Sequence, residues 1–271
     1  MTTCQAPITS WDHGGSSAPT KLETSVSVRR LLPIAAAVLA AALTACNPSA
    51  ANESDSKPSA DASASASAEA SPSAAAGAPA DGSGLSLTAA IAKIPAADEV
   101  RDGYKRDSFK HWTDEDSDSC STRNEVLLAE AVKAPEQGAR CALTGGEWLS
   151  YYDEVTVTAA GKLDIDHMVP LAEAWDSGAS AWDADRRMRY ANDLDAERSL
   201  VAVTAKTNRS KADKDPSEWM PPAKSAQCTY LADWTATKLR WKLTADDKER
   251  AALEKLAVDC PDTVVKYEAA P

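Results

Sequence analysis

Three side chains in the sequence have the chemistry that phosphodiester hydrolysis requires. Asp166 and His167 are adjacent in the segment LDIDH (163–167), and Asn208 lies further along the chain. An imidazole can deprotonate water as a general base, while carboxylate and amide oxygens are hard ligands that suit Mg²⁺ or Mn²⁺. Such a cation neutralises charge on the phosphate and on the leaving oxygen. Asp166, His167 and Asn208 therefore suit hydrolysis of a phosphodiester that is assisted by one divalent ion.

Other hydrolytic or metal-binding motifs are missing or incomplete. The chain after residue 84 has two histidines, which excludes any mechanism with several imidazoles, and His111 is interpreted as a surface or packing residue. There is no G-x-S-x-G elbow, no P-loop and no HExxH zinc helix. Asp114, Asp116 and Asp118 alternate as in a calcium loop, but the turn glycine and the distal glutamate of that loop are missing.

The apolar pattern predicts the elements that position the three side chains. Residues 163–169 favour a strand that Pro170 ends, and residues 199–204 (SLVAVT) favour a second short strand. A helix over 205–213 then carries Asn208. Because adjacent residues on a strand point to opposite faces, Asp166 and the following histidine share one side only if the strand twists or ends there.

The rest of the pattern predicts a mostly helical surround. Residues 148–158 are rich in β-branched and aromatic residues and favour a strand, and Thr244 with Asp247 resembles a helix N-cap arrangement. Further helices are expected over 85–94, 121–133, 170–176, 181–191, 224–240 and 244–258.

Several segments together resemble a known family. The strings DIDHMVP (164–170), SLVAV (199–203) and TNRSK (207–211) resemble the ββα-metal motif of HNH endonucleases. The likeness is strongest toward secreted actinobacterial HNH family proteins and the C-terminal nuclease domain of GmrSD-type restriction enzymes, and CSTRNEVL (120–127) and WMPP (219–222) extend it. It covers roughly residues 101–260 and implies an α+β fold. The expected architecture is a ββα-metal (HNH) core embedded in a mostly helical, disulfide-stabilised single domain.

The resemblance implies a role for each of these residues. Asp166 and Asn208 would be the metal ligands, His167 the general base, and Lys211 would lie near the phosphate. Asp164 is interpreted as a group that supports the metal ligands, and a solvated strand residue is the alternative. The central Asn of the family motif falls, by its spacing, on Ser199. In the family this Asn orders the loop around the base, and Ser can make one hydrogen bond there with less reach.

A locally basic stretch lies within an acidic chain. The net charge is −12, which argues against nucleic-acid binding through a broad basic face. Between residues 186 and 214, however, there are eight basic and four acidic residues. Either these cations form a solvated helix face or they contact phosphate. The predicted phosphate-binding residues are Arg209, Lys211, Arg186 and Arg187.

Four cysteines fall within the expected domain. An even number in an exported protein favours disulfides, and four cysteines allow three pairings. Cys120–Cys141 and Cys228–Cys260 are favoured because each pair encloses a short stretch that can close locally. No C-x-x-C pair is present, which disfavours a zinc site.

The first part of the chain has the pattern of export and anchoring. Arg29 and Arg30 precede an apolar run over 31–43 that is too short for a typical membrane span. Its end, LTAC (43–46), resembles the bacterial lipobox, so Cys46 is the predicted lipidation site. An ordinary signal peptide with a chance cysteine is the alternative. Residues 1–46 are therefore interpreted as a leader and lipoprotein signal peptide.

The remaining boundaries follow from composition. Residues 47–84 are dominated by Ala, Ser and Pro and cannot bury enough apolar surface to fold, which predicts a disordered linker. Seven of the eight tryptophans lie in 85–271, which indicates a packed domain. That region is the predicted HNH nuclease-like domain.

The predicted function is a sequence-tolerant DNA endonuclease held on the outer face of the bacterial cell membrane, or secreted. It would need one divalent ion, Mg²⁺ or Mn²⁺, and would contact nucleic acid as substrate and the membrane through Cys46. No protein partner is evident, and no recognition module such as a zinc finger is present. The alternative is a binding lipoprotein that kept the fold and lost catalysis, motivated by Ser199 and the acidic composition.

Overall fold

The structure, a computed structural model, describes residues 84–271. The predicted leader, the predicted linker except its last residue, and Cys46 lie outside the described residues. None of the helices between Gly84 and Pro271 has the length and apolar character needed to span a bilayer.

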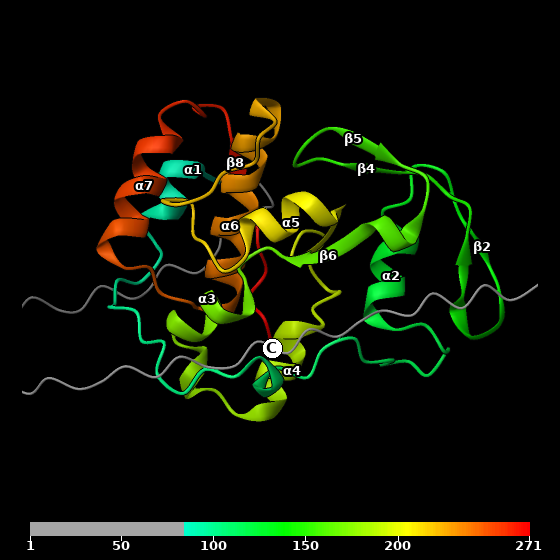
Figure 1. Cartoon of the computed structure of the whole chain (residues 1–271). Coiled ribbons are helices and arrows are strands. Elements are labelled where there is room, and N and C mark those ends of the chain that lie inside the picture. Colours follow the sequence, from blue (N-terminus) through cyan, green and yellow to red (C-terminus); the bar gives the residue numbers. More distant parts are fainter. Residues whose placement is uncertain (1–83) are drawn as a thin grey trace, which may run out of the picture. The chain divides into compact units, whose positions relative to one another are not determined.

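Helices and short strands alternate along the described chain (Figure 1). The helices are α1 (Leu87–Ile91), α2 (Thr122–Ala129), α3 (Leu171–Asp176), α4 (Ala184–Ala191), α5 (Ala205–Lys211), α6 (Gln227–Trp241) and α7 (Asp247–Ala257). The strands are β1 (Leu85–Ser86), β2 (Glu136–Gln137), β3 (Leu143–Thr144), β4 (Trp148–Ser150), β5 (Val155–Val157), β6 (Leu163–His167), β7 (Leu200–Thr204) and β8 (Val264–Val265). Within 84–271 they form antiparallel pairs β1–β8, β2–β3, β4–β5 and β6–β7. This mixed content agrees with the predicted α+β class.

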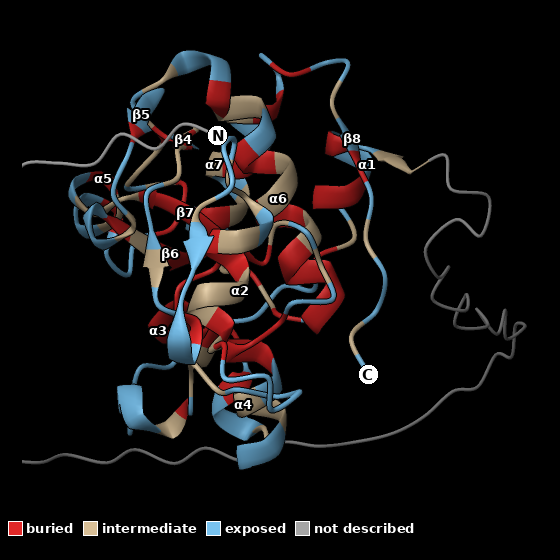
Figure 2. Ribbon diagram, turned by 90° about the vertical axis from the view of Figure 1, so that its right-hand side faces the viewer, coloured by how far each residue is buried: buried red, intermediate tan, exposed pale blue. Residues whose placement is uncertain are grey.

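The β6–β7 pair lies between two apolar clusters. Its register places Asp166 opposite Val201 and His167 opposite Leu200. Because side chains alternate along a strand, Leu200 packs with the cluster under α2, whereas Val201 and Val203 pack into the larger cluster around α6. In Figure 2 both strands of the pair carry the buried colour over most of their length.

Helix α5 begins directly after β7 and packs against β6. Thr204 is its N-cap, since its hydroxyl accepts a hydrogen bond from the Thr207 backbone N–H. The helix ends at Lys211, after which Ala212 has a positive φ of 52°. A strand–strand–helix unit therefore forms in the order that the sequence predicts over 163–213.

Three predicted elements differ from the structure. The segment 148–158 is a β4–β5 hairpin instead of one strand, because the chain turns at 151–154 with Glu154 at a positive φ of 56°. Residues Leu85–Ser86 pair with β8 before α1 begins, so the expected helix over 85–94 starts later and is shorter. Helix α7 is capped by Asp246, which accepts from Glu249 N, while the Thr244 hydroxyl donates to Ser177 O.

Helix α6 is at the centre of the larger apolar cluster. Tyr230, Trp234 and Trp241 recur at helical spacing and are buried, and α1 and α7 pack against the helix. Lys238 lies on the same buried side, where its ammonium is 2.8 Å from carboxylates of Glu173 and Glu249. Burying three charged groups is tolerated because they satisfy one another, and removing one partner typically costs about 3–5 kcal/mol.

Both predicted disulfides are present. Cys120–Cys141 joins the start of α2 to the segment before β3, with a Cα–Cα distance of 5.0 Å. Cys228–Cys260 joins the first turn of α6 to the chain after α7, with a Cα–Cα distance of 5.5 Å. Both distances lie within the normal range for disulfides. The pairing that sequence spacing favoured is confirmed.

Glu130, at the end of α2, is half-buried, and one of its carboxylate oxygens is enclosed without a partner. Its Oε2 accepts a hydrogen bond from the Ala202 backbone N–H at 2.9 Å, whereas its Oε1 has no partner among the described residues. Burial raises the pKa of Glu130 from 4.5 to about 7. The folded protein therefore retains this proton up to a higher pH than the unfolded chain does. The contribution of the protonated side chain to stability is lost as the pH rises from about 4.5 through about 7.

We expect Glu130→Gln to raise the melting temperature at pH 8 by a few degrees, on the order of 1 kcal/mol, because the amide is neutral at every pH. At pH 5 the effect should be small, since most of the wild-type side chain is already protonated. Thermal unfolding followed by circular dichroism at both pH values checks this. Glu136→Gln, at an exposed position on β2, is the control. An equal rise at pH 5 and pH 8 would contradict the explanation.

Candidate functional site

The two faces of β6 carry different parts of the predicted site. Asp164 and Asp166 point to the face that α5 covers, where they meet side chains of that helix. His167, the last residue of the strand, packs instead against the rings of Trp112 and Tyr190. The period of two along a strand explains this division. The structure thus places the base and the carboxylates on opposite faces at the end of one strand.

Asp166 is buried in a charge pair with Lys211. The ammonium of Lys211 is 2.5 Å from Asp166 Oδ2 and also donates to the carbonyls of His167 and Met168. The Tyr152 hydroxyl donates to the same Oδ2 at 2.6 Å. Burial raises the pKa of Asp166 and lowers that of Lys211, while their mutual attraction opposes both changes. Both hydrogen bonds to the carboxylate use Oδ2, so Oδ1 is the oxygen left for a ligand.

Lys211 therefore has a different role from the predicted phosphate contact. Its side chain is 0% exposed and lies among the rings of Tyr152, Tyr230 and Trp234. An ammonium in this position cannot meet a phosphate in solution. It fixes Asp166 and the end of β6 from inside the domain.

Asn208 pairs with Asp164, one turn of α5 before Lys211. Its Nδ2 donates to Asp164 Oδ2 at 3.4 Å, which directs the amide oxygen away from that carboxylate. The guanidinium of Arg209 is 3.4 Å from the same carboxylate and its side chain is 76% exposed. Asp164 thus orients the predicted metal ligand, as its supporting role implies, and Arg209 is open to solvent.

The imidazole of His167 has a defined tautomer. Its Nε2 lies 3.0 Å from the backbone carbonyl oxygen of Ala191, and a carbonyl can only accept, so Nε2 carries the hydrogen. Nδ1 is then the nitrogen with the lone pair. Burial lowers the pKa of His167 to about 3, which leaves the ring neutral near pH 7. A neutral imidazole with one unprotonated nitrogen can accept a proton from water.

Asn192 secures the segment around this imidazole and was missed by the sequence analysis. It directly follows Ala191 and is 5% exposed. Its Nδ2 donates to the carbonyls of Lys110 and Met188, and its Oδ1 accepts from Thr113 N and the hydroxyl of Thr122. The available signal was its position as the C-cap of α4. Asn192 therefore joins the segment 110–113 and the start of α2 to the end of α4, next to the imidazole.

Ser199, the residue that aligns with the central Asn, is buried at the start of β7. Its hydroxyl donates to Asp193 Oδ2 at 2.7 Å, and its carbonyl accepts from Met168 N. Asp193 is also held by Arg240 and by the Trp241 indole. Ser199 thus joins a buried polar cluster to the residue that follows His167, and its role in ordering the loop around the base stays a prediction.

The two other predicted phosphate-binding residues make internal contacts. The Arg186 guanidinium lies 4.7 Å from the Trp182 ring centre and donates to Trp241 O. Arg187 donates to the carbonyls of Ser108, Ala179 and Trp182. Both cations hold α4 and its neighbours together. Within the four residues predicted from the basic stretch, Arg209 is the one that the structure leaves largely exposed.

Acidic clusters occur elsewhere on the described surface. Carboxylate oxygens of Asp114, Asp116 and Asp118 lie within 4.8 Å of one another. Each of these side chains accepts a backbone N–H of its own loop, from Ser119, Asp118 and Cys120 respectively. Those hydrogen bonds account for the loop geometry without a cation.

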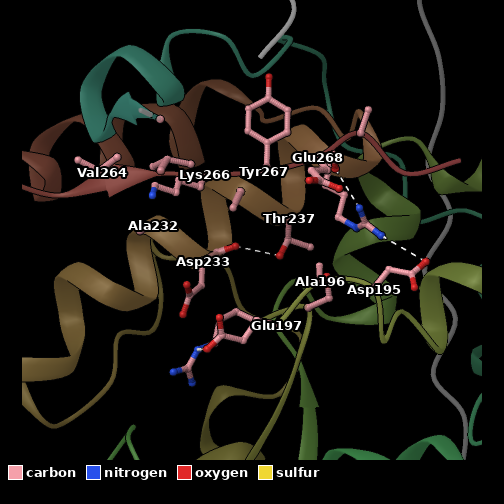
Figure 3. A pocket seen from close by; sticks show the side chains of 17 residues that line it. Asp195, Ala196, Glu197, Ala232, Asp233, Thr237, Val264, Lys266, Tyr267 and Glu268 are labelled. Carbon is pink, nitrogen blue, oxygen red and sulfur yellow. Dashed lines mark hydrogen bonds and ion pairs between the residues drawn. The ribbon is translucent and has the colours of Figure 1, made fainter. Parts of the chain in front are cut away.

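A cavity of about 830 Å³ opens on the side of the domain next to Ser199 (Figure 3). It lies between the segment 195–199, α6 and the C-terminal segment 264–269. Asp233 and Thr237 of α6 face it, whereas His167 and Asn208 do not line it. This cavity is separate from the residues around the end of β6.

The described region is thus an α+β domain with a strand–strand–helix unit whose first strand ends in Asp-His. The chain belongs to the family described as GmrSD restriction endonucleases, C-terminal domain, which matches residues 104–256. The match spans all the site residues discussed above and confirms the resemblance to a GmrSD-type nuclease domain.

A relative in a fungus has a similar sequence. A protein of Arthroderma benhamiae named "Uncharacterized secreted protein" is 42% identical over 160 residues, which are 59% of this chain and 77% of that protein. No solved structure matches the chain.

Asn192→Ala should lower the free energy of unfolding by about 2–4 kcal/mol, because it leaves buried carbonyl and N–H groups without partners. Ser199→Ala is the matched comparison and should cost about 1 kcal/mol, since Asp193 keeps its other donors. Urea unfolding of both variants measures the difference. Equal losses in the two variants would show that Asn192 does not have the larger role.

Proposed function

We propose that the chain is a metal-dependent nuclease that hydrolyses phosphodiester bonds with His167 as the general base. The observation that carries the proposal is the Nε2–H contact to the Ala191 carbonyl, which leaves Nδ1 free to accept a proton. Membership of a restriction-endonuclease domain family supports a nucleic-acid substrate.

In this proposal the substrate itself strengthens the base. A neutral imidazole in an apolar setting accepts a proton weakly, because the imidazolium is poorly solvated. An anionic phosphate next to His167 would stabilise the imidazolium and so raise its affinity for the proton of the attacking water. The carbonyl of Ala191 keeps its hydrogen bond in both protonation states and holds the ring in place.

Asp166 and Asn208 would hold the divalent ion, Mg²⁺ or Mn²⁺. Each presents one oxygen that its own partners leave unused: Asp166 Oδ1, because Oδ2 is taken by Lys211 and Tyr152, and Asn208 Oδ1, because Nδ2 is taken by Asp164. Two hard oxygen donors with retained waters suit these ions. When bound, the cation supplies charge stabilisation to the phosphate and the leaving oxygen.

We propose an extracytoplasmic location. The domain has two disulfides, and disulfides form and persist mainly in oxidising compartments. The Arthroderma benhamiae relative is named as a secreted protein. Because the sequence LTAC (43–46) resembles a lipobox, we propose that a lipid on Cys46 anchors the protein to the membrane. The substrate proposed is DNA, cut with little sequence preference.

One observation favours a second candidate, a binding lipoprotein without catalysis. Lys211 already satisfies Asp166 in a buried pair, which competes with a cation for that carboxylate. Incubating the protein with supercoiled plasmid or single-stranded DNA and Mg²⁺ or Mn²⁺ separates the two functions. Metal-dependent cleavage of either substrate that EDTA stops supports the nuclease, and both substrates intact at micromolar protein support the binding protein.

His167→Ala should reduce metal-dependent plasmid nicking by about 10²- to 10⁴-fold, the usual contribution of a general base. The fold should persist, which near-ultraviolet circular dichroism of the variant can verify. Glu136→Gln, exposed and remote in sequence, controls for handling and should nick at the wild-type rate. Wild-type activity in the His167→Ala protein would remove this residue from the mechanism.

Asn208→Ala should weaken Mn²⁺ binding, measured by isothermal titration calorimetry, by at least tenfold because one of two protein ligands is lost. Asn208→Asp keeps an oxygen there but loses the hydrogen bond to Asp164, so it should bind Mn²⁺ more tightly than Asn208→Ala. If both variants bind Mn²⁺ with the wild-type affinity, the ion is held elsewhere.

A further inference from the structure

The segment 106–112 lies across the predicted base. The Trp112 ring centre is 5.5 Å from that of His167, with the two planes inclined by 34°. The His111 ring lies 6.4 Å from His167 and 5.2 Å from Trp112, nearly perpendicular to both. Arg106, at the start of the same segment, is exposed. Two aromatic rings therefore border the imidazole, and an exposed guanidinium belongs to the same segment.

Trp112 is held in a conformation that large side chains rarely adopt. Its φ is +60°, in the left-handed region, where Cβ is crowded against the backbone. Asn192 fixes both sides of it, because its amide bonds the carbonyl of Lys110 and the N–H of Thr113. A strained residue that persists needs surrounding contacts to hold it, and such residues cluster at functional sites. Ala191, whose carbonyl accepts from His167, directly precedes Asn192. One short segment therefore positions the rings of both Trp112 and His167.

This surface has polar atoms that the described residues leave without hydrogen-bond partners. The indole N–H of Trp112 makes no hydrogen bond within residues 84–271, and the ring is half-buried. The Nδ1 of His111 is bonded to the Phe109 carbonyl at 2.9 Å, which turns Nε2 away from the backbone. Apolar packing alone would not require an unpaired N–H or a strained backbone. These features fit a surface that is completed by a ligand.

We propose that Trp112, with His111 and Arg106, binds an unpaired nucleotide beside the scissile phosphate, so that the substrate class is single-stranded nucleic acid. This rests on the proposed nuclease function. The indole face would stack on a nucleobase, and Arg106 would contact a neighbouring phosphate. Base stacking on aromatic side chains is independent of sequence because every base has a π-face. In a duplex both faces of each base are already stacked on neighbouring bases. Paired DNA therefore has no free base face for the Trp112 indole.

The test compares single-stranded and duplex substrates with matched variants of the full chain. The probes are a fluorescein-labelled oligothymidine and a labelled duplex of the same length. Cleavage is measured with Mn²⁺, and binding by anisotropy with EDTA in its place, so that His167 keeps its contact with Trp112. Trp112→Leu keeps an apolar side chain but removes the aromatic face, and Trp112→Phe keeps both. Arg106→Gln is paired with Arg140→Gln, an exposed arginine in the Cys120–Cys141 loop.

The wild type should cleave and bind the single strand in preference to the duplex. Trp112→Leu should raise the Kd for the single strand by about tenfold, leave the duplex unaffected, and be rescued by Trp112→Phe. Arg106→Gln should reduce the salt dependence of binding, whereas Arg140→Gln should not.

Two negative outcomes are distinguishable. If the wild type cleaves nucleic acid but Trp112→Leu binds the single strand with unchanged affinity, or weakens duplex binding equally, the stacking surface is overturned and the nuclease stands. If the wild type neither cleaves nor binds either probe, the proposed function fails and this inference fails with it.

Discussion

The register of β6 on β7 is the constraint on which the site depends. His167 is paired with Leu200, and its side chain lies on one face of the strand pair. Asp166 is paired with Val201, and its side chain lies on the other face. Apolar neighbours of β7 belong to different clusters on the two faces, so each face is specified by packing. A slip of one residue would exchange the two sets of side chains. It would bury the imidazole against α5 and leave the carboxylate without Lys211.

Several buried carboxylates pair with buried cations, and these pairs explain the positions of three basic residues. Lys211 pairs with Asp166, Lys238 with two glutamates, and Arg240 with Asp193. Desolvation makes each group costly on its own, while the pair is tolerated when the remaining donors also find acceptors. Lys211 meets this condition through two backbone carbonyls at the end of β6. The pair at the site is thus part of the way this acidic domain folds, and it also limits how Asp166 can serve a cation.

Much of the site's framework could be predicted because it depends on short-range rules. The apolar pattern and Pro170 predicted a strand over 163–169, and the structure has one over Leu163–His167. The spacing of the cysteines along the chain predicted both disulfide pairs. The errors concern side chains whose partners are distant in sequence. Nothing near Asn192 shows that Lys110 and Thr113 will reach it, and nothing near Lys211 shows that three aromatic rings will enclose it.

The charge of a segment can be read from the sequence, whereas the charge of a surface depends on contacts between residues distant in sequence. Arg186 and Arg187 raise the basic count between residues 186 and 214, yet their guanidinium groups stack on tryptophans and donate to carbonyls. With these cations turned inward and a net charge of −12, fewer groups remain to gain affinity by releasing counterions from phosphates. A protein in this position needs a source of binding energy that does not depend on charge. An aromatic surface beside His167 supplies one, since stacking on a nucleobase is unaffected by the repulsion between an acidic protein and a polyanion.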